Sequence, residues 1–411
     1  MRVLIVSQYF WPENFRINDI SKLLVKNGVE VSVLTGCPNY PQGKSFDGYK
    51  NTVSTVEHHA DGYLIYRVPL ILRGNGSAMK LSLNYISYVF NGIIFGSRLL
   101  YDLKFDLIFV YGTSPISQVI VGIYFKYTRK VKLITWVQDL WPESLAFTGY
   151  IKNKILLSLV KKVVSWIYRN NDLLLAQSKD FIPAIENKSG NVKVLYFPNP
   201  GETVSSHPSF NGNLDLFLNN GFNIVFAGNF GTVQSLPMVL DAAEILINYD
   251  DIRIILIGSG SQSIWLSDEI ESRQLNNVLL PGRYSAEAMP AIFNRASALL
   301  VSLTLDPVLN LTIPAKLQSY LAAGKPIIAS LGGAGAQIVK DAKAGIVCAC
   351  EDPHALAEAI LKLKSMDQED LENMGSSGRR YYEENFNPDT LVKKLIKIFT
   401  EVNSDCKNNN S

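Results

Sequence analysis

The sequence has 411 residues, of which 47% are hydrophobic and 18% are charged, and its formal net charge is +2. This apolar content excludes a wholly disordered chain, and the near-neutral charge excludes nucleic-acid binding driven by overall electrostatics. Because a single core rarely grows beyond about 300 residues, the length predicts two domains of roughly 200 residues each.

The first half of the chain alternates apolar strands with helical patterns. A buried-strand pattern at 2–7 is too short for a signal-peptide core, and a helix at 15–27 stops before a second strand at 30–35. Further buried strands are predicted at 107–111, 132–137 and 173–177. Strand, loop, helix and strand in this order predict a doubly wound α/β domain.

A cluster of structure-breaking residues at 197–201 predicts a hinge, and the same alternation starts again after it. Strands are predicted at 223–227, 253–257, 326–330 and 344–347, with a helix at 235–248. We therefore expect a first domain at 1–196, a second at 197–387, an amphipathic helix at 388–402 that packs back on the first domain, and a flexible tail at 403–411.

The cysteines predict neither a disulfide framework nor a metal site. They are Cys37, Cys348, Cys350 and Cys406, and they form no CxxC pair and have no nearby histidine ligands. A reducing cytoplasm fits this pattern.

The segment at 311–329 carries the most informative local pattern. Thr312 can cap a helix, Pro314 suits a first helical turn, and Gly324 suits the C-terminal stop before the next strand. The pattern therefore predicts a helix whose N-terminus lies at the carboxyl ends of the strands.

Free backbone N–H groups near Ile313 would point outward at that edge, where diphosphates bind. Lys316 lies in the first helical turn, where the helix dipole disfavours a cation, and a bound anion would offset that cost. The alternative is a capped helix that carries a solvated lysine.

Four motifs follow one another in the second half: VFAGNFG at 225–231, LIGSG at 256–260, the stretch at 282–301, and the helix pattern at 314–326. Two aromatic segments, QYFWPE at 8–13 and WVQDLWPE at 136–143, lie in the first half. In this order they resemble family 4 of the retaining glycosyltransferases, and within it the WbuB-like enzymes of O-antigen and capsule assembly.

The resemblance implies the GT-B fold, an α/β architecture of two Rossmann-like doubly wound parallel-sheet domains that face a cleft. It implies that the domain at 1–196 binds the acceptor and that the domain at 197–387 binds a nucleotide-sugar donor. The implied donor-binding residues are Gly228, Asn229, Gly231, Ser259, Gly260, Asn310, Thr312, Ile313 and Gln318.

Two departures from the family pattern change the expected electrostatics. Family members commonly carry two glutamates at the positions of Asn310 and Gln318, where amides keep hydrogen bonding without charge. They also often carry an arginine and a lysine at the positions of Asn229 and Gln234. Lys316 and Arg283 are then the candidate catalytic groups that neutralise the diphosphate, and we expect no metal or other cofactor.

In the first domain, Glu13 and Asn14 follow the first strand, at the edge where ligands collect, and are candidate substrate-binding residues. Asp139 follows the strand at 132–137 and is a candidate catalytic carboxylate that hydrogen-bonds an acceptor hydroxyl. A solvated loop for the first pair and a turn-forming aspartate for Asp139 are about equally plausible alternatives.

The resemblance implies retaining transfer by a front-face mechanism, from a UDP-activated, N-acetylated amino sugar to a polyprenyl-diphosphate-linked acceptor in O-antigen or capsule biosynthesis. Two alternatives remain: a nucleotide-sugar 2-epimerase of the same fold, and a non-catalytic sugar-nucleotide-binding partner of an assembly complex. The amides at Asn310 and Gln318 argue against an epimerase, which needs acid and base groups beside the sugar.

A basic, amphipathic stretch at 151–171 has no acidic residue and predicts peripheral docking on the inner face of the cytoplasmic membrane. A helix packed in the core with a solvated basic edge is the equal alternative. The segment at 81–100 is 20 residues long, but Asn84, Asn91 and Arg98 interrupt it, so we interpret it as interfacial or buried in preference to membrane-spanning.

Overall fold

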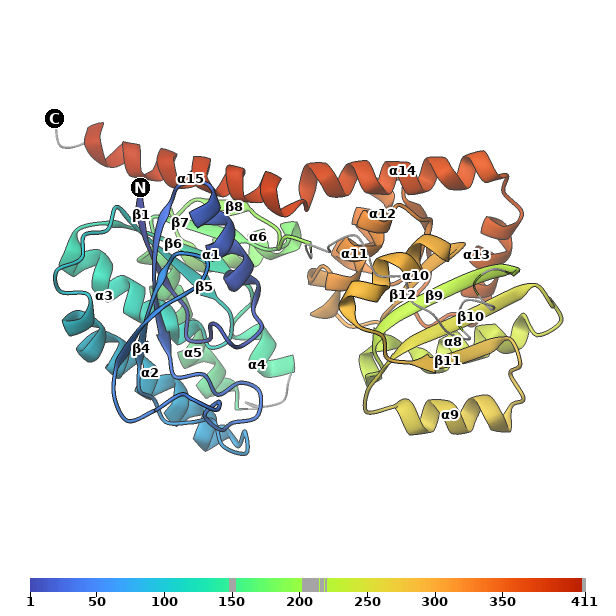
Figure 1. The fold of residues 1–411 in the computed structure, drawn as a ribbon, viewed down its shortest axis with the longest axis horizontal. Coiled ribbons are helices and arrows are strands. Elements are labelled where there is room, and N and C mark those ends of the chain that lie inside the picture. The colour runs from blue at the N-terminus through green and yellow to red at the C-terminus, as the bar shows by residue number, and fades with distance from the viewer. Residues whose placement is uncertain (148–152, 202–213, 215–217, 219, 409–411) are drawn as a thin grey trace. The chain divides into compact units, whose positions relative to one another are not determined.

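The computed structural model describes residues 1–147, 153–201, 214, 218 and 220–408. The chain forms two compact units (Figure 1): a first unit of Met1–Asn199 with Pro388–Ser411, and a second unit of Pro200–Asn387. Each unit is built on one largely or wholly parallel sheet, so the predicted α/β fold class with two Rossmann-like domains is confirmed.

The first unit has an eight-stranded sheet in the order β3-β4-β2-β1-β5-β6-β7-β8, in which only β3 is antiparallel to its neighbour. Its strands are β1 (Arg2–Val6), β2 (Glu30–Gly36), β3 (Thr55–His58), β4 (Leu64–Val68), β5 (Leu107–Gly112), β6 (Lys132–Val137), β7 (Leu173–Ala176) and β8 (Val194–Tyr196). Its helices are α1 (Arg16–Lys26), α2 (Ala78–Leu99), α3 (Val119–Arg129), α4 (Glu143–Phe147), α5 (Lys154–Arg169), α6 (Ile182–Ser189) and α15 (Pro388–Asn408).

Side-chain alternation along β1 assigns one set of helices to each face of this sheet. Val3 and Ile5 pack in one core cluster with residues of α1 and α15. On the other face, the hydroxyl of Tyr88 on α2 donates to the carbonyl of Leu34 on β2 at 3.1 Å. The alternate β1 residues Leu4 and Val6 are also buried but are not part of the cluster of Val3 and Ile5.

The C-terminal helix α15 returns to the first unit after the chain has built the second. Its buried side chains join the core cluster of β1 and β5; they are Leu391, Val392, Leu395, Ile398 and Phe399. The helix extends to Asn408, past the end at 402 that the sequence predicts, and residues 409–411 of the predicted flexible tail lie outside the described residues.

The second unit has a six-stranded, all-parallel sheet in the order β11-β10-β9-β12-β13-β14. Its strands are β9 (Phe222–Asn229), β10 (Ile252–Ser259), β11 (Val278–Gly282), β12 (Ala298–Ser302), β13 (Ile327–Ser330) and β14 (Gly345–Cys348). Its helices are α8 (Leu236–Ile245), α9 (Ser263–Ser272), α10 (Met289–Arg295), α11 (Ala315–Ala323), α12 (Gly333–Asp341), α13 (Pro353–Lys364) and α14 (Gln368–Asn385).

Strands β3 and β4 are absent from the elements that the sequence predicts, because a charged residue interrupts the apolar run of β4. Arg67 is the fourth of the five residues of this strand, and its guanidinium pairs with Glu57 of β3 at 2.8 Å. The ion pair allows a buried arginine inside the sheet.

The segment at 81–100 lies almost entirely within α2. Within the part of the chain that the structure describes, we find no helix whose length and apolar character would let it cross a membrane.

Candidate functional site

In the second unit, the carboxyl ends of the parallel strands bring together the motifs that the sequence singles out. β9 ends at Asn229, β10 at Ser259 and β11 at Gly282, and the loops that follow lie at the same edge of the sheet. The loops after β12 and β13 lead from this edge into α11 and α12. Helix N-termini therefore point to the edge where ligands collect in open parallel sheets.

The loops after β9 and β10 touch through backbone atoms, and this contact requires glycine. Gly228 and Gly258 have φ angles of 144° and 149°, and a Cβ atom on Gly258 would lie 1.8 Å from the carbonyl oxygen of Gly228. The Phe230 N–H donates to the Ser259 carbonyl at 3.0 Å, which ties the two loops together.

Gly231 and Gly260, two other predicted donor-binding residues, lie in the same two loops after β9 and β10. A Cβ atom on Gly260 would lie 2.4 Å from the carbonyl oxygen of Phe230, and one on Gly231 would lie 2.7 Å from Nδ2 of Asn229. The Gly260 N–H donates to Oγ of Ser263 at 2.8 Å, so this donor is already used inside the protein.

Lys316, the second residue of α11, reaches this glycine loop. Its Nζ atom lies 3.2 Å from the place of a Cβ atom on Gly228 and 3.7 Å from the centroid of the Phe226 ring. It donates a hydrogen bond of 2.7 Å to Oε1 of Gln234. Burial lowers the pKa of Lys316 to about 7, and no carboxylate pairs with it among the described residues. A bound anion would favour the ammonium form of this side chain, and the part of Lys316 in binding a diphosphate stays a prediction.

Asn310 lies in a short 3₁₀ turn, Leu309–Leu311, against the start of α12. A Cβ atom on Gly332 would lie 2.8 Å from Oδ1 of Asn310. Gly333 has a φ of 59°, and a Cβ atom on it would lie 1.9 Å from the backbone carbonyl oxygen of Asn310. The Asn310 amide therefore lies beside the backbone N–H groups at the N-terminus of α12.

Gln318 is buried on α11, one turn after the N-terminal residues of the helix. The side chain of Ile313 packs at the margin of the core of the second unit. The roles of both residues in binding nucleotide stay predictions.

Thr312 does not cap α11, contrary to the sequence-based expectation. The hydroxyl of Thr312 donates to the Leu309 carbonyl at 2.9 Å, because the residues before it form a 3₁₀ turn, and Pro314 occupies the N-cap position. The helix starts at Ala315, so its first N–H groups are those of Ala315 and Lys316, two and three residues after Ile313.

Arg283 follows β11 directly and is exposed. Among the described residues it has no hydrogen bond or ion pair, and no contact connects it with Lys316. It lies at the edge that the site occupies, but its part in neutralising a diphosphate stays a prediction.

In the first unit, Glu13 is buried in the loop after β1, and backbone groups use both of its carboxylate oxygens. Oε1 accepts from the N–H groups of Asn39 and Tyr40, each at 2.7 Å, and Oε2 accepts from Phe10 at 3.0 Å. Burial raises the pKa of Glu13 to about 7, against the lowering effect of these bonds. Through these hydrogen bonds, Glu13 links the loop after β1 to the loop after β2. A direct contact between Glu13 and a substrate stays a prediction. Its neighbour Asn14 is exposed.

Asp139 is half-buried at the carboxyl end of β6 and also contacts a neighbouring loop. Its Oδ2 atom accepts from the Ser114 N–H at 2.7 Å, and the Ser114 hydroxyl accepts from Nε1 of Trp141 at 2.9 Å. These bonds orient the carboxylate at the carboxyl edge of its sheet.

Tyr320 and the pair Gly332-Gly333 are site residues that sequence patterns alone did not single out. The hydroxyl of Tyr320 accepts from the N–H of Ala227 at 2.8 Å, which joins α11 to β9 below the glycine loop. The Gly-Gly pair directly after a predicted strand is the signal that could have identified the α12 N-terminus.

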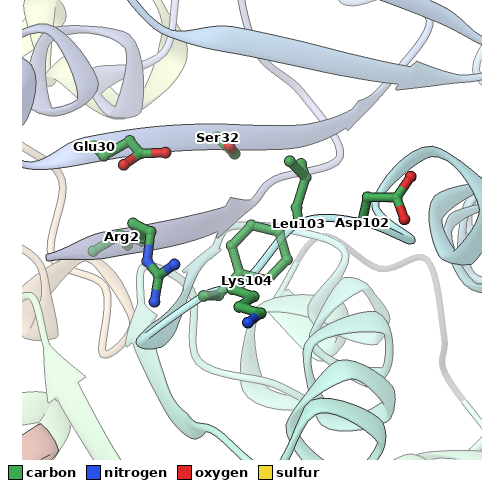
Figure 2. Close-up of a pocket in the computed structure, with 8 residues that line it drawn as sticks. Arg2, Glu30, Ser32, Asp102, Leu103 and Lys104 are labelled. Atoms are coloured by element: carbon green, nitrogen blue, oxygen red, sulfur yellow. The ribbon is translucent and has the colours of Figure 1, made fainter.

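A pocket of about 240 Å³ lies elsewhere in the first unit, at the amino ends of β1 and β2 and before β5. Figure 2 shows Arg2, Glu30, Asp102 and Lys104 around it. Because the strands are parallel, this pocket lies at the edge opposite to Glu13 and Asp139. The described residues include no group of three or more His, Cys, Asp or Glu side chains that could hold a metal ion.

Residues 216–381, which include the glycine loop and Lys316, match the family model of glycosyl transferases group 1. The probable glycosyltransferase WbjE of Pseudomonas aeruginosa is 23% identical over 341 residues, which cover 78% of this chain and 81% of that protein. The uncharacterized glycosyltransferase MJ1178 of Methanocaldococcus jannaschii is 21% identical over 362 residues, which cover 87% of this chain and 89% of that protein.

Solved structures similar to this chain share the fold at low sequence identity. The sucrose-phosphate synthase of Thermosynechococcus elongatus matches with a TM-score of 0.69 and 14% identity, over 98% of this chain and 99% of that one. Anabaena Alr3699/HepE in complex with UDP also matches with a TM-score of 0.69 and 14% identity, over 98% of this chain and 100% of that one.

Proposed function

Since this chain is a glycosyltransferase with the GT-B fold, we propose that it transfers an N-acetylated amino sugar from a UDP-linked donor to a polyprenyl-diphosphate-linked acceptor. The proposal places it among the WbuB-like members of family 4, in the assembly of O-antigen or capsule. One observation carries the donor half of the proposal: the Lys316 ammonium, which has no carboxylate partner among the described residues, lies beside the Gly228 loop.

The donor diphosphate binds between this loop and the N-termini of α11 and α12. Lys316 supplies a full charge and the helix N-termini supply partial charges, and Arg283 adds to the field from the end of β11. Asn310 and Gln318 hydrogen-bond the sugar and the ribose. The UDP complex of Anabaena Alr3699/HepE supports uridine as the base. No metal is required, because these groups already supply positive charge.

Transfer proceeds on one face of the sugar. The bond between the anomeric carbon and the diphosphate oxygen breaks, and its electrons pass to the leaving UDP. The acceptor oxygen forms the new bond on the same face, and its proton passes to the leaving phosphate oxygen. The protein acts by positioning the reactants and stabilising the charge on the diphosphate. Asp139 accepts a hydrogen bond from the acceptor hydroxyl.

The lipid-linked acceptor requires peripheral association with the inner face of the cytoplasmic membrane. The basic helix α5 supports this, since it has four cationic residues and no acidic one: Lys154, Lys161, Lys162 and Arg169. Residues 151–152 of the predicted docking stretch lie outside the described residues.

The test measures release of UDP from UDP-linked N-acetylated sugars with and without a polyprenyl-diphosphate-linked sugar, and the anomeric configuration of the product by NMR. We expect UDP release only with the lipid acceptor, and retention in the product. Conversion of the donor to its 2-epimer without acceptor would replace the proposal with an epimerase. Binding of the donor without any turnover would instead identify the protein as a non-catalytic sugar-nucleotide-binding partner of an assembly complex. Thermal-shift measurements with UDP-, GDP- and dTDP-sugars would identify the base first.

A further inference from the structure

Helix α2 is apolar on both of its sides. Its inner side is buried against the sheet through Leu81, Asn84, Tyr88, Gly92 and Gly96. Its outer side exposes five large apolar residues at helical spacing, each between 40% and 70% accessible: Met79, Leu83, Ile86, Phe90 and Ile94. A helix that is apolar all round faces either a core or a membrane, and the outer side of α2 faces no core of the described chain.

This apolar stripe is part of a wider surface. The side chain of Ser97 on α2 donates to the hydroxyl of Tyr124 on α3 at 3.0 Å, and the hydroxyl of Tyr127 on α3 donates to Asn170 at the end of α5 at 2.7 Å. Helix α5 has its own exposed apolar residues, between 44% and 74% accessible: Ile155, Leu156, Leu159, Val163 and Trp166. Two apolar ridges therefore flank α3 on one layer of helices.

Basic residues dominate the charge of this layer, in which Lys126 of α3 is paired with Asp172 at 2.9 Å. The three helices contain eight basic residues and no acidic residue; the basic ones are Lys80, Arg98, Lys126, Arg129, Lys154, Lys161, Lys162 and Arg169. Lys80 and Arg98 flank the apolar stripe of α2 at its two ends, and Lys161 and Lys162 lie beside that of α5. Long cationic side chains at the margin of an apolar stripe can reach phosphate groups at a lipid surface.

We propose that the outer face of α2, α3 and α5, hereafter the α2 face, docks on a bilayer that contains anionic lipid, with α2 lying in the membrane plane. The apolar stripe of α2 spans 16 residues, from Met79 to Ile94, which is about 22 Å of in-plane helix. Lipid fits this face better than a second copy of the chain, because two such faces would bring the exposed cations of both copies together, among them Lys154, Lys161 and Lys162. The proposal rests on the lipid-linked acceptor of the proposed function and extends docking beyond α5 to α2.

The geometry also relates the α2 face to the acceptor edge. In a parallel sheet, a helix that follows a strand starts at the carboxyl edge, so α2 and α3 start at the edge that carries Asp139 and Ser114. The N-terminal part of the apolar stripe, Met79 and Leu83, therefore lies toward that edge. A lipid tail held along α2 would keep its diphosphate head near the carboxyl edge of the first unit.

The experiment is flotation of the full-length protein with vesicles of phosphatidylglycerol and phosphatidylcholine, or of phosphatidylcholine alone. The test variant is Ile86→Ser with Phe90→Ser, and the matched control is Ile264→Ser, which changes an isoleucine 79% exposed on α9 of the second unit. We expect the double variant to lose at least tenfold in partitioning into anionic vesicles and the control to match wild type. Circular dichroism and the melting temperature check that both variants fold.

A spectroscopic arm uses Trp166, which is 49% exposed on α5. The part of the tryptophan emission that Trp166→Phe removes should shift to the blue and be quenched by brominated lipid, and this quenching should weaken in the double variant. Unchanged partitioning of the double variant would overturn the docking role of α2. A wild-type dimer that becomes monomeric in the double variant, without vesicle binding, would assign the face to a second copy instead.

Sugar transfer to a water-soluble acceptor with a short lipid chain separates this inference from the proposed function. We expect the double variant to retain wild-type turnover with that acceptor, since none of its changes touches the donor site or Asp139. Vesicle binding without any transfer by wild type would contradict the proposed function and leave the docking surface standing.

Discussion

Nζ of Lys316 donates a hydrogen bond of 2.7 Å to Oε1 of Gln234, a residue 82 positions earlier in the chain. The partner is a neutral amide, so the bond holds the ammonium beside the glycine loop without cancelling its charge. Buried cations are normally paired with carboxylates, and this one has none among the described residues. A diphosphate in the donor site would supply the missing negative charge.

Replacement of Lys316 by methionine should lower turnover by about a hundredfold, because a preorganised charge at the leaving group is removed. The melting temperature of the variant at pH 7 should be no lower than that of the wild-type protein. Burial lowers the pKa of Lys316 from 10.5 to about 7, so the folded state disfavours the ammonium that the unfolded chain prefers. Steady-state kinetics and thermal melting measure both effects. Wild-type kinetics in the variant would remove Lys316 from the site.

Donor binding should take up a proton at pH 8. With a pKa of about 7, Lys316 is mostly neutral in the free protein at that pH, and a bound diphosphate favours the ammonium. Affinity for UDP should therefore fall as the pH rises above about 7. Calorimetry in buffers with different ionisation enthalpies counts the protons, and Lys316→Arg is the control that should bind without proton uptake. Equal proton counts for wild type and this control would contradict the assignment.

Replacement of Gly228 by alanine should weaken donor binding while the fold is kept. The new Cβ atom would lie 3.2 Å from Nζ of Lys316 and would displace the ammonium, and the φ of 144° is rare for alanine. Gly282→Ala is the matched control, because its φ of 87° is also positive but its Cβ atom meets nothing within 4 Å. Thermal shift with UDP compares them. An equal loss of the UDP-induced thermal shift in both variants would indicate that backbone strain, and not crowding of Lys316, weakens binding.

Replacement of Gln318 by leucine should weaken UDP and the UDP-sugar equally, by about 1–3 kcal/mol, if its amide hydrogen-bonds the ribose. Gln318→Glu restores the residue that family members commonly carry and should keep binding. Calorimetric titration of both ligands measures the two affinities. A loss confined to the sugar-bearing donor would move the contact from the ribose to the sugar.

The alternation of apolar runs and helical patterns was enough to predict the two parallel sheets, because each buried strand and each stop signal is a local feature. Lys316 was identified in the same way, since a lysine in a first helical turn conflicts with the helix dipole. Strand β4 was missed because its Arg67 pairs with Glu57 on a different strand.

The sequence by itself determined the alternation and order of most strands and helices, since these follow from periodicity and from stop signals. Only the tertiary structure decided their partners. It placed the Glu13 carboxylate against the N–H groups of Asn39 and Tyr40, the Lys316 amine against Gln234, and the outer side of α2 toward solvent. The physical reason is that a hydrogen bond or an exposed face depends on which distant segments pack together, and local patterns do not encode that packing.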